Sequence, residues 1–530
     1  MINEAQSFLA RVVPELARLQ KESNLAYWAA SRTSAKADEE RLVAAESSLR
    51  LFFADREAYG ELKALLARAG EWDELTRRQL ELLRDQYLPN QLEPSVIQEL
   101  VRRESELTSL FAGFRARLET GEVTDNELKR ILREESDSAL REKAWTASKQ
   151  IGEEAAPKVL ELVELRNEAA RTLGYPDYYR FALATNELDE AELFRTLEHL
   201  KAVTDDPFRQ AKAELDRSLA ARFGVSVAEL RPWHYADPFF QEAPAGEVDL
   251  DPYFRDQDVV DLARRYYAGI GLEIGDIIAR SDLYERPGKE QHAYCTDIDR
   301  EGDVRVLENV HPTMRWAETT LHEMGHAVYD KYTDPSLPYL LRGPAHTLTT
   351  EAVAMMMGRL VTDAGWLARV RGLSEAEARK VADPARRHLR LNELIFVRWG
   401  LVVVFFEREL YRDPRQDLSR LWKEKVEALQ FLTYPLQRHA PDWAAKIHLA
   451  AYPAYYQNYL LGTLTASQFG WAIRQALGQG ALVGNPATGD FLRERIFRPG
   501  ARWPWNELIR RATGQPLNPD LFIEEFVGRR

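Results

Sequence analysis

The sequence contains a single cysteine, Cys295, among 530 residues. No disulfide can form within one chain, so the fold must be stable without covalent cross-links. Such a composition is typical of proteins in a reducing compartment. We therefore expect a cytoplasmic protein.

Long uninterrupted apolar runs are also absent. The first twenty residues carry Glu4, Arg11 and Glu15, where a signal peptide needs an unbroken apolar stretch. The most apolar later segment, "IFVRWGLVVVFFEREL", contains Arg398 and Glu407 and falls short of the roughly 20 residues that span a membrane. These features predict no secretion signal and no membrane partner, and they indicate a buried helix at this segment.

An excess of positive charge is missing as well. Lys and Arg number 71 against 84 Asp and Glu, which gives a formal net charge of -13 and argues against a nucleic-acid-binding surface. In contrast, hydrophobic residues make up 45% of the chain, with 12 Trp, 21 Tyr and 21 Phe. Because the chain exceeds the usual size of one hydrophobic core, we expect a globular protein with two lobes.

Strand-like sequence is scarce. Residues 1–230 repeat apolar positions at three- and four-residue spacing, which predicts long helices, and the Pro- and Gly-containing stretch 237–252 predicts an internal boundary. The clearest extended segment is "EQHAYCTDIDREGDVRVLENV" from residue 290, where "DREG" favours the turn of a β-hairpin. The fold class is therefore mostly α. The pattern leaves open whether the hairpin binds substrate or is only structural.

The segment "TTLHEMGHAVYDKY", residues 319–332, places two histidines four residues apart. Roughly 0.03 such histidine–acid–histidine patterns are expected by chance in a chain of this composition, although histidines on an amphipathic helix are often only hydrogen-bonded residues at a core boundary. On one helical face, His322 and His326 can share a tetrahedral metal ion, and Glu323 can reach a water at that ion as general base. Gly325 permits a close neighbour.

A third metal ligand must come from another segment, because a catalytic zinc site has three protein ligands. "LTTEAVAMMMGRLV" offers Glu351, which follows His326 by 25 residues. We expect Thr349 or Thr350 to cap the helix that carries Glu351 in its first turn. Glu351 is either a metal ligand or a favourable charge at the helix dipole, and the pattern alone fits both.

The segment "KIHLAAYPAYYQNYLLG" concentrates phenols and an imidazole near a lysine. Tyr456 and Tyr459 fall on one helical face. Such groups donate hydrogen bonds to a developing oxyanion, or else they are aromatic core residues with satisfied hydroxyls. Both interpretations remain open from the pattern.

Six segments together resemble the angiotensin-converting-enzyme-like zinc peptidases, which are helical gluzincins. In family order they are "ELRNEAARTLGYPDYYR" in part, "LHEMGHAVY", "LPYLLRG", "EAVA", "KIHL…YYQNY" and "RWPWNELIRRATGQP". They cover most of the chain from about residue 160 onward, and the N-terminal helices fit more loosely. The resemblance implies a large two-lobed helical fold around a deep central channel. It further implies one peptidase domain over residues 1–530, with a lid and channel wall in 1–240 and the zinc- and substrate-binding core in 285–465.

The resemblance also assigns roles around the metal. It implies that His322, His326 and Glu351 bind one zinc ion per chain and that Glu323 activates the water. It implies further that Tyr459 stabilises the oxyanion.

Substrate-binding roles follow from the same resemblance. His292 and His448 would hold the substrate backbone near the scissile bond, and the backbone of Ala293 would pair with the extended peptide. Lys446 and Tyr456 would bind the C-terminal carboxylate of the substrate.

Three positions depart from the family pattern. Met355 replaces an aspartate that orients the first zinc-binding histidine, so the partner of His322 is unassigned and metal affinity falls by about tenfold to a hundredfold unless another acceptor substitutes. His234 and Tyr235 stand near the place of a glutamine that assists carboxylate capture. Asn458 replaces a chloride-binding arginine, which makes dependence on chloride doubtful.

The sequence therefore predicts a zinc metallopeptidase that hydrolyses short peptides, with a dipeptidyl carboxypeptidase as the leading interpretation. An oligoendopeptidase of the related helical gluzincins is the first alternative, because the carboxylate-binding set is incomplete. A catalytically weak peptide-binding protein is the second. The presence of Glu323 argues against that second alternative, since a protein without catalysis needs no general base.

Overall fold

The computed structural model describes residues 3–244 and 249–528, and the chain divides into two compact units. Unit 1 comprises Met1–Gln91, Val248–Asp383 and Leu461–Phe522. Unit 2 comprises Leu92–Glu247, Pro384–Leu460 and Ile523–Arg530. Each unit is thus built from three separate stretches of chain.

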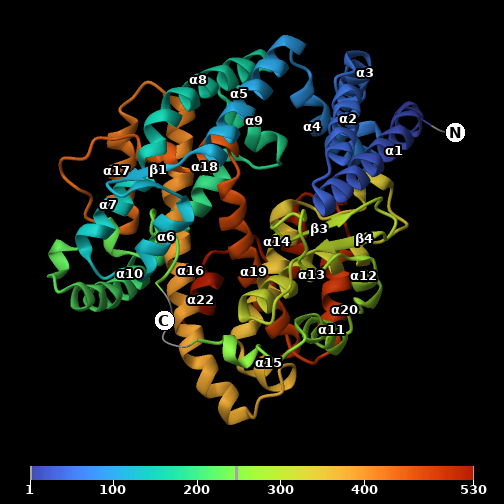
Figure 1. Cartoon of the computed structure of the whole chain (residues 1–530). Coiled ribbons are helices and arrows are strands. Elements are labelled where there is room, and N and C mark those ends of the chain that lie inside the picture. Colours follow the sequence, from blue (N-terminus) through green and yellow to red (C-terminus); the bar gives the residue numbers. More distant parts are fainter. Residues whose placement is uncertain (1–2, 245–248, 529–530) are drawn as a thin grey trace. The chain divides into compact units, whose positions relative to one another are not determined.

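Unit 1 is helical apart from one hairpin (Figure 1). Its helices are α1 (Glu4–Thr33), α2 (Lys36–Phe53), α3 (Arg56–Leu66), α4 (Glu74–Tyr87), α11 (Val259–Gly269), α12 (Gly275–Arg280), α13 (Met314–Tyr332), α14 (Thr347–Gly358), α15 (Ala364–Arg369), α20 (Ala487–Leu492) and α21 (Trp505–Thr513). The strands are β3 (Tyr294–Asp297) and β4 (Val304–Leu307). The hairpin predicted from residue 290 is therefore confirmed.

The four N-terminal helices of unit 1 share an apolar core. Phe8 and Leu16 of α1 pack with Leu62 of α3 and Leu83 of α4, and all four are at most 1% exposed. These positions recur at helical spacing along α1, as the apolar pattern of the sequence predicted. Ser34, in the left-handed backbone region with φ 48°, ends α1 and lets the chain turn into α2.

Unit 2 is also mostly helical. Its helices are α5 (Pro94–Gly113), α6 (Asp125–Glu134), α7 (Ser138–Ser148), α8 (Gln150–Thr172), α9 (Tyr178–Thr185), α10 (Glu190–Phe223), α17 (Leu418–Gln430) and α18 (Ile447–Ala451). A short antiparallel hairpin joins β1 (Ala116–Leu118) and β2 (Gly121–Val123). α5 and α8 pack side by side (Figure 1).

Three helices contain residues of both units: α16 (Glu375–Arg412), α19 (Tyr456–Leu477) and α22 (Asp520–Phe526). The apolar segment around Arg398 lies in α16, and its residues are buried as predicted. The guanidinium of Arg398 donates to the backbone oxygen of Leu429 and pairs with Asp205, which compensates for its burial. Over the described residues, no helix combines the length and the apolarity that crossing a membrane requires.

The predicted turn cluster at 237–252 is only partly covered, because residues 245–248 lie outside the described residues. Its first part is an irregular loop organised by Asp237. The carboxylate of Asp237 accepts hydrogen bonds from the backbone N–H groups of Phe239, Gln241 and Glu242. This pattern of local bonds is how aspartate stabilises turns, and it fixes the position of Gln241.

Candidate active site

The helix that carries the paired histidines begins at a capped end. Thr313 accepts a hydrogen bond from the backbone N–H of Trp316, which satisfies one of the unpaired donors at the start of α13. Leu321, Met324 and Val328 are at most 1% exposed and form the apolar stripe that the sequence predicted. The histidines lie on the helical face that is turned toward α14.

Gly325 sets the distance between α13 and α14. A Cβ atom at this position would lie 2.8 Å from the Cα of Ala354, closer than real atoms approach. The absence of a side chain therefore lets the two helix backbones meet directly. This close packing brings Glu351 of α14 to the histidines of α13.

His322, His326 and Glu351 place one donor atom each within 4.8 Å of one another. The Nε2 atoms of the two histidines are 3.3 Å apart, and an oxygen of Glu351 lies 3.7 Å from Nε2 of His322 and 3.9 Å from Nε2 of His326. Ligands about 2.0–2.1 Å from a tetrahedral ion are separated by roughly 3.3 Å. Two imidazoles and a carboxylate at these separations fit a zinc ion.

Burial keeps both imidazoles in the form that binds metal. It lowers the pKa of His322 to about 4, and burial together with His322 lowers the pKa of His326 to about 3. Neutral imidazole offers a nitrogen lone pair, whereas imidazolium offers none. Burial also raises the pKa of Glu351 to about 7, which reflects the cost of a buried carboxylate without a nearby positive charge.

Thr350 supplies a partner that the sequence reasoning missed. Its hydroxyl lies 2.7 Å from Nδ1 of His326, so the ring is held with Nε2 directed at the donor cluster. Met355, at the place of the family's aspartate, instead lies with its sulfur 3.6 Å from the hydroxyl of Thr463. Thr350 therefore orients the second histidine, and the partner of His322 that the family's aspartate would supply stays unassigned.

The predicted start of the helix that carries Glu351 is wrong. α14 begins at Thr347, and His346 rather than Thr349 or Thr350 caps it by accepting from the backbone N–H of Leu348. Glu351 therefore lies in the second turn. The difference arises because a histidine ring can accept a backbone hydrogen bond as a serine or threonine does. Thr349 then completes the capping box through the backbone of His346, and Thr350 is left to contact His326.

Glu323 lies beside the donor cluster in an acidic environment. Burial, followed by the charges of Glu308 and Glu351, holds the pKa of Glu323 well above its usual range. One contact opposes this effect, since the backbone N–H of Cys295 in β3 donates to the Glu323 carboxylate. α13 packs against β3 and β4 (Figure 1), so the hairpin orients the predicted base.

The outer edge of β3 is the side that faces Glu323. β3 pairs with β4 in antiparallel register, and β4 is bridged on its other side at Asp282. Because the N–H of Cys295 points away from β4, the residue two positions earlier, Ala293, presents its backbone to the same edge if the chain stays extended. His292 precedes it with a 94% exposed side chain, 3.0 Å from Glu290.

The other predicted residues come together in unit 2. The ring of His448 lies 5.1 Å from that of Tyr456 and 6.3 Å from that of Tyr459, and the two tyrosine rings are 5.3 Å apart. Nζ of Lys446 lies 5.6 Å from the centre of the Tyr456 ring. The structure therefore unites Lys446, His448, Tyr456 and Tyr459 in one cluster, and Tyr456 and Tyr459 share a helical face as predicted.

In this cluster, the hydroxyl of Tyr456 and the ring of His448 can each form a further hydrogen bond. The hydroxyl of Tyr456 accepts from Nε1 of Trp399 at 2.6 Å, which leaves its own proton to donate. Nδ1 of His448 is buried without a hydrogen-bond partner among the described residues. Burial and then the charge of Lys446 lower the pKa of His448 to about 4, so the ring is neutral.

Gln241 is a second residue that the sequence reasoning missed. Its side-chain oxygen accepts a hydrogen bond from Nζ of Lys446 at 2.8 Å. The neighbours expected to replace the family's glutamine have structural partners: His234 contacts Ser138, and the Tyr235 hydroxyl contacts Lys212 and Asp216. One sequence signal could have indicated Gln241. It follows Asp237 by four residues, within the range in which an aspartate organises a turn and fixes the residues after it.

The comparisons with known proteins agree with this geometry. The sequence matches the model described as Peptidase family M3 over residues 131–528 and the model described as angiotensin-converting enzyme over residues 2–231. Angiotensin-converting enzyme of Bos taurus is 24% identical over 423 residues, covering 72% of this chain and 31% of that protein. The enzyme of Sus scrofa is 23% identical over 421 residues, covering 70% and 31%. The chain thus spans less than a third of the length of these relatives.

Proposed function

Because the chain belongs to Peptidase family M3, we propose that it is a zinc metallopeptidase that releases dipeptides from the free C-terminus of short peptides. The predicted resemblance to the helical zinc peptidases is confirmed at the level of the family. One observation carries the proposal. The donors of His322, His326 and Glu351 converge with Glu323 directly beside them.

The donor cluster would hold one zinc ion, which supplies a Lewis acid that polarises the scissile carbonyl and makes water more acidic. Glu323 takes the proton from the attacking water and delivers it to the leaving amine. The burial that raises the pKa of Glu323 favours the step in which it holds that proton. The N–H of Cys295 keeps the carboxylate oriented between the two steps.

Tyr459 and His448 stabilise the oxyanion that forms when water attacks. A phenol and a neutral imidazole each offer one donor, and donors fixed before the reaction stabilise developing charge without reorganisation. The surrounding aromatic rings of Phe396, Tyr455 and Tyr456 hold Tyr459 in place.

Two further features would bind the substrate. The edge of β3 at Ala293 pairs with the extended backbone of the peptide, and His292 and His448 hold its carbonyls. Lys446 binds the terminal carboxylate together with Tyr456 and Gln241. Charge-assisted hydrogen bonds are about twice as strong as neutral ones, so Lys446 dominates this selection.

The experiment compares one hexapeptide as the free acid and as the C-terminal amide, with mass spectrometry to identify the cleaved bond. We expect zinc at about one ion per chain, cleavage two residues from the free C-terminus, and slow cleavage of the amide. Activity should change little with added chloride, because Asn458 carries no positive charge.

A different result distinguishes the alternatives. Equal cleavage of acid and amide at internal bonds would identify an oligoendopeptidase and leave the metal chemistry intact. Peptide binding without hydrolysis in the zinc-loaded protein would contradict the proposed activity and support a peptide-binding protein.

A further inference from the structure

Unit 2 contains a strained residue between the helices that carry His448 and Tyr459. Residues 452–455 join α18, which carries His448, to α19, which carries Tyr456 and Tyr459. Within this connection Ala454 has φ 52°, in the left-handed backbone region that a residue with a side chain seldom adopts. Strained residues persist only where neighbouring groups hold them, and they cluster at functional sites. The contacts of Ala454 therefore bear on how the two helices are held.

Two buried side chains bind the backbone of Ala454. The carboxyl group of Glu407 in α16 accepts a hydrogen bond from its N–H at 2.8 Å, and the side-chain amide of Gln457 in α19 donates to its carbonyl oxygen. Glu407 is 2% exposed and Gln457 is 1% exposed. Loss of either side chain would leave a buried backbone group without this partner, and the left-handed conformation would lose its support.

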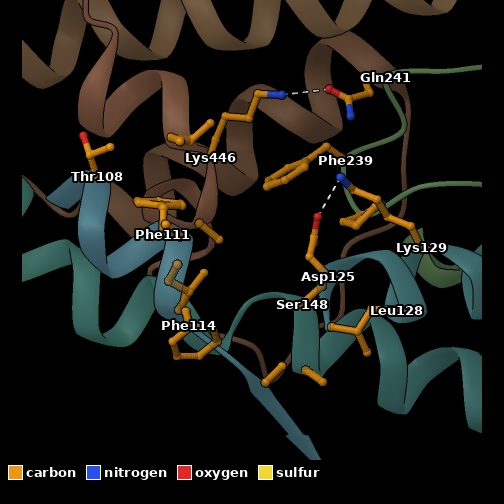
Figure 2. Close-up of a pocket in the computed structure, with 17 residues that line it drawn as sticks. Thr108, Phe111, Phe114, Asp125, Leu128, Lys129, Ser148, Phe239, Gln241 and Lys446 are labelled. Carbon is orange, nitrogen blue, oxygen red and sulfur yellow. Dashed lines mark hydrogen bonds and ion pairs between the residues drawn. The ribbon is translucent and has the colours of Figure 1, made fainter. Parts of the chain in front are cut away.

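The two ends of the connection are held by different contacts. At the α18 end, Lys446 immediately precedes the helix and donates to Gln241, and Figure 2 shows this contact at the edge of a cavity of about 380 Å³. At the α19 end, Ala454 stands two residues before Tyr456, the first residue of the helix. Loss of the Ala454 contacts should therefore displace the start of α19 and leave α18 in place.

Burial makes Glu407 a neutral acceptor. It raises the pKa of Glu407 to about 8, whereas the N–H of Ala454 and the charge of Arg166 oppose this shift. At neutral pH the carboxyl group is therefore mostly protonated, and a glutamine offers a neutral acceptor oxygen on a side chain of the same length. Glu407→Gln can keep the contact with Ala454, whereas Glu407→Met removes it with little change in length.

We propose that Glu407 is a positioning residue, which acts through Ala454 to set the first turn of α19 and with it the direction of the Tyr459 side chain. Gln457 has the same role from within α19. Both residues act on the backbone rather than on the substrate. The effect on catalysis rests on the proposed function, in which the hydroxyl of Tyr459 stabilises the oxyanion. Because such a donor must stand close to its ideal position, its displacement should lower kcat.

Hydrogen–deuterium exchange of the full-length protein with zinc present, read by mass spectrometry at pH 7, tests the positioning without turnover. We expect amide exchange in residues 454–460 to be at least about tenfold faster in Glu407→Met and within about twofold of the wild type in Glu407→Gln. Tyr411→Phe is the matched control. Tyr411 lies one turn later on α16, is 1% exposed, and accepts a buried hydrogen bond from Arg166. Its loss should leave exchange in residues 454–460 unchanged.

Steady-state kinetics tests the effect on catalysis. Glu407→Met should lower kcat about tenfold to a hundredfold, and Glu407→Gln should restore it to within about twofold of the wild type. KM should change less than about threefold, because Trp399 also holds the Tyr456 hydroxyl. In a Tyr459→Phe background, Glu407→Met should lower kcat no further, because the donor that it positions is already absent. If Glu407→Met does not fold, Gln457→Met removes the other contact and has the same expected effects.

The outcomes separate this inference from the proposed function. Faster exchange and lower kcat in Glu407→Met, both reversed in Glu407→Gln, support it. Unchanged exchange, unchanged kcat, or an equal loss of kcat with and without the Tyr459 hydroxyl overturns it, even when the wild-type protein releases dipeptides. If the wild-type protein cleaves no peptide, the proposed function fails, and exchange in residues 454–460 alone decides whether Glu407 positions α19.

Discussion

The metal-donor cluster of unit 1 and the Lys446 cluster of unit 2 differ in the sign of their buried charge. In the first, buried neutral imidazoles and two carboxylates with raised pKa values gather without a cation. In the second, the buried ammonium of Lys446 faces aromatic rings and donates to the amide of Gln241, and within the described residues no carboxylate forms an ion pair with it. Under the proposed function a ligand supplies the compensating charge in each region: a metal ion in the first and a carboxylate in the second.

Replacing Glu323 should have the largest effect and should separate catalysis from metal binding within the first region. Glu323→Gln should retain about one zinc per chain while kcat falls by at least about 10²- to 10⁴-fold, since the general base is lost. Metal content by mass spectrometry and steady-state kinetics measure the two outcomes. Glu318→Gln, five residues earlier at an exposed position of the same helix, should change neither. Loss of zinc in Glu323→Gln would make Glu323 a structural residue instead.

Tyr459→Phe tests whether the aromatic cluster takes part in the chemistry or only packs. We expect kcat to fall by about 10² to 10³ with KM almost unchanged, because the hydroxyl acts mainly in the transition state. Tyr452→Phe, at a 54% exposed position in the same segment, is the matched control. An unaltered kcat would show that Tyr459 only packs in the aromatic cluster.

Thr350→Val tests how much the orientation of His326 contributes to metal affinity. The substitution keeps the shape of the side chain but removes the 2.7 Å hydrogen bond to Nδ1. Zinc affinity should fall about tenfold to a hundredfold, measured by competition with a chelator. Thr349→Val removes a neighbouring hydroxyl that bonds to the backbone of His346, and it should leave the affinity unchanged.

The pH dependence of substrate binding tests the Lys446 cluster, and its expected effect is the smallest of the four. Burial lowers the pKa of Lys446 to about 8, so the ammonium is present below that pH and is lost as the pH rises through it. Above pH 8, KM for a free-acid peptide should rise by up to about tenfold per unit, while KM for its amide stays flat. Lys446→Arg should keep the preference for the acid but remove this rise, because arginine remains charged. The same rise for acid and amide would exclude Lys446 as its source.

The two regions also differ in how far the sequence predicted them. The pairing of His322 with His326 follows from helical spacing, whereas the pattern left the role of Glu351 open and only the family resemblance assigned it to the metal. Gln241 and Lys446 are 205 positions apart, and only tertiary packing brings them together. Thr350 was assigned to a helix cap because its hydroxyl suits that role as well as it suits a histidine.

The mostly helical fold and the hairpin beside the histidine helix followed from the periodicity of apolar residues. Periodicity did not predict which stretches of chain form each unit, because each unit is assembled from three separate stretches. Periodicity reports which face of a helix is buried, and it carries no information on which distant helix covers that face.

The close packing of α13 and α14 at Gly325 has a consequence for how the protein folds. All three donors lie within residues 322–351 on two consecutive α-helices, so the metal cluster is a contact of low sequence separation. Such contacts form early, because little chain entropy is lost in closing the loop between them. A zinc ion bound as we propose would link α13 to α14 while residues 461–522 of the same unit are still to be synthesised, and it would stabilise this helix pair from then on.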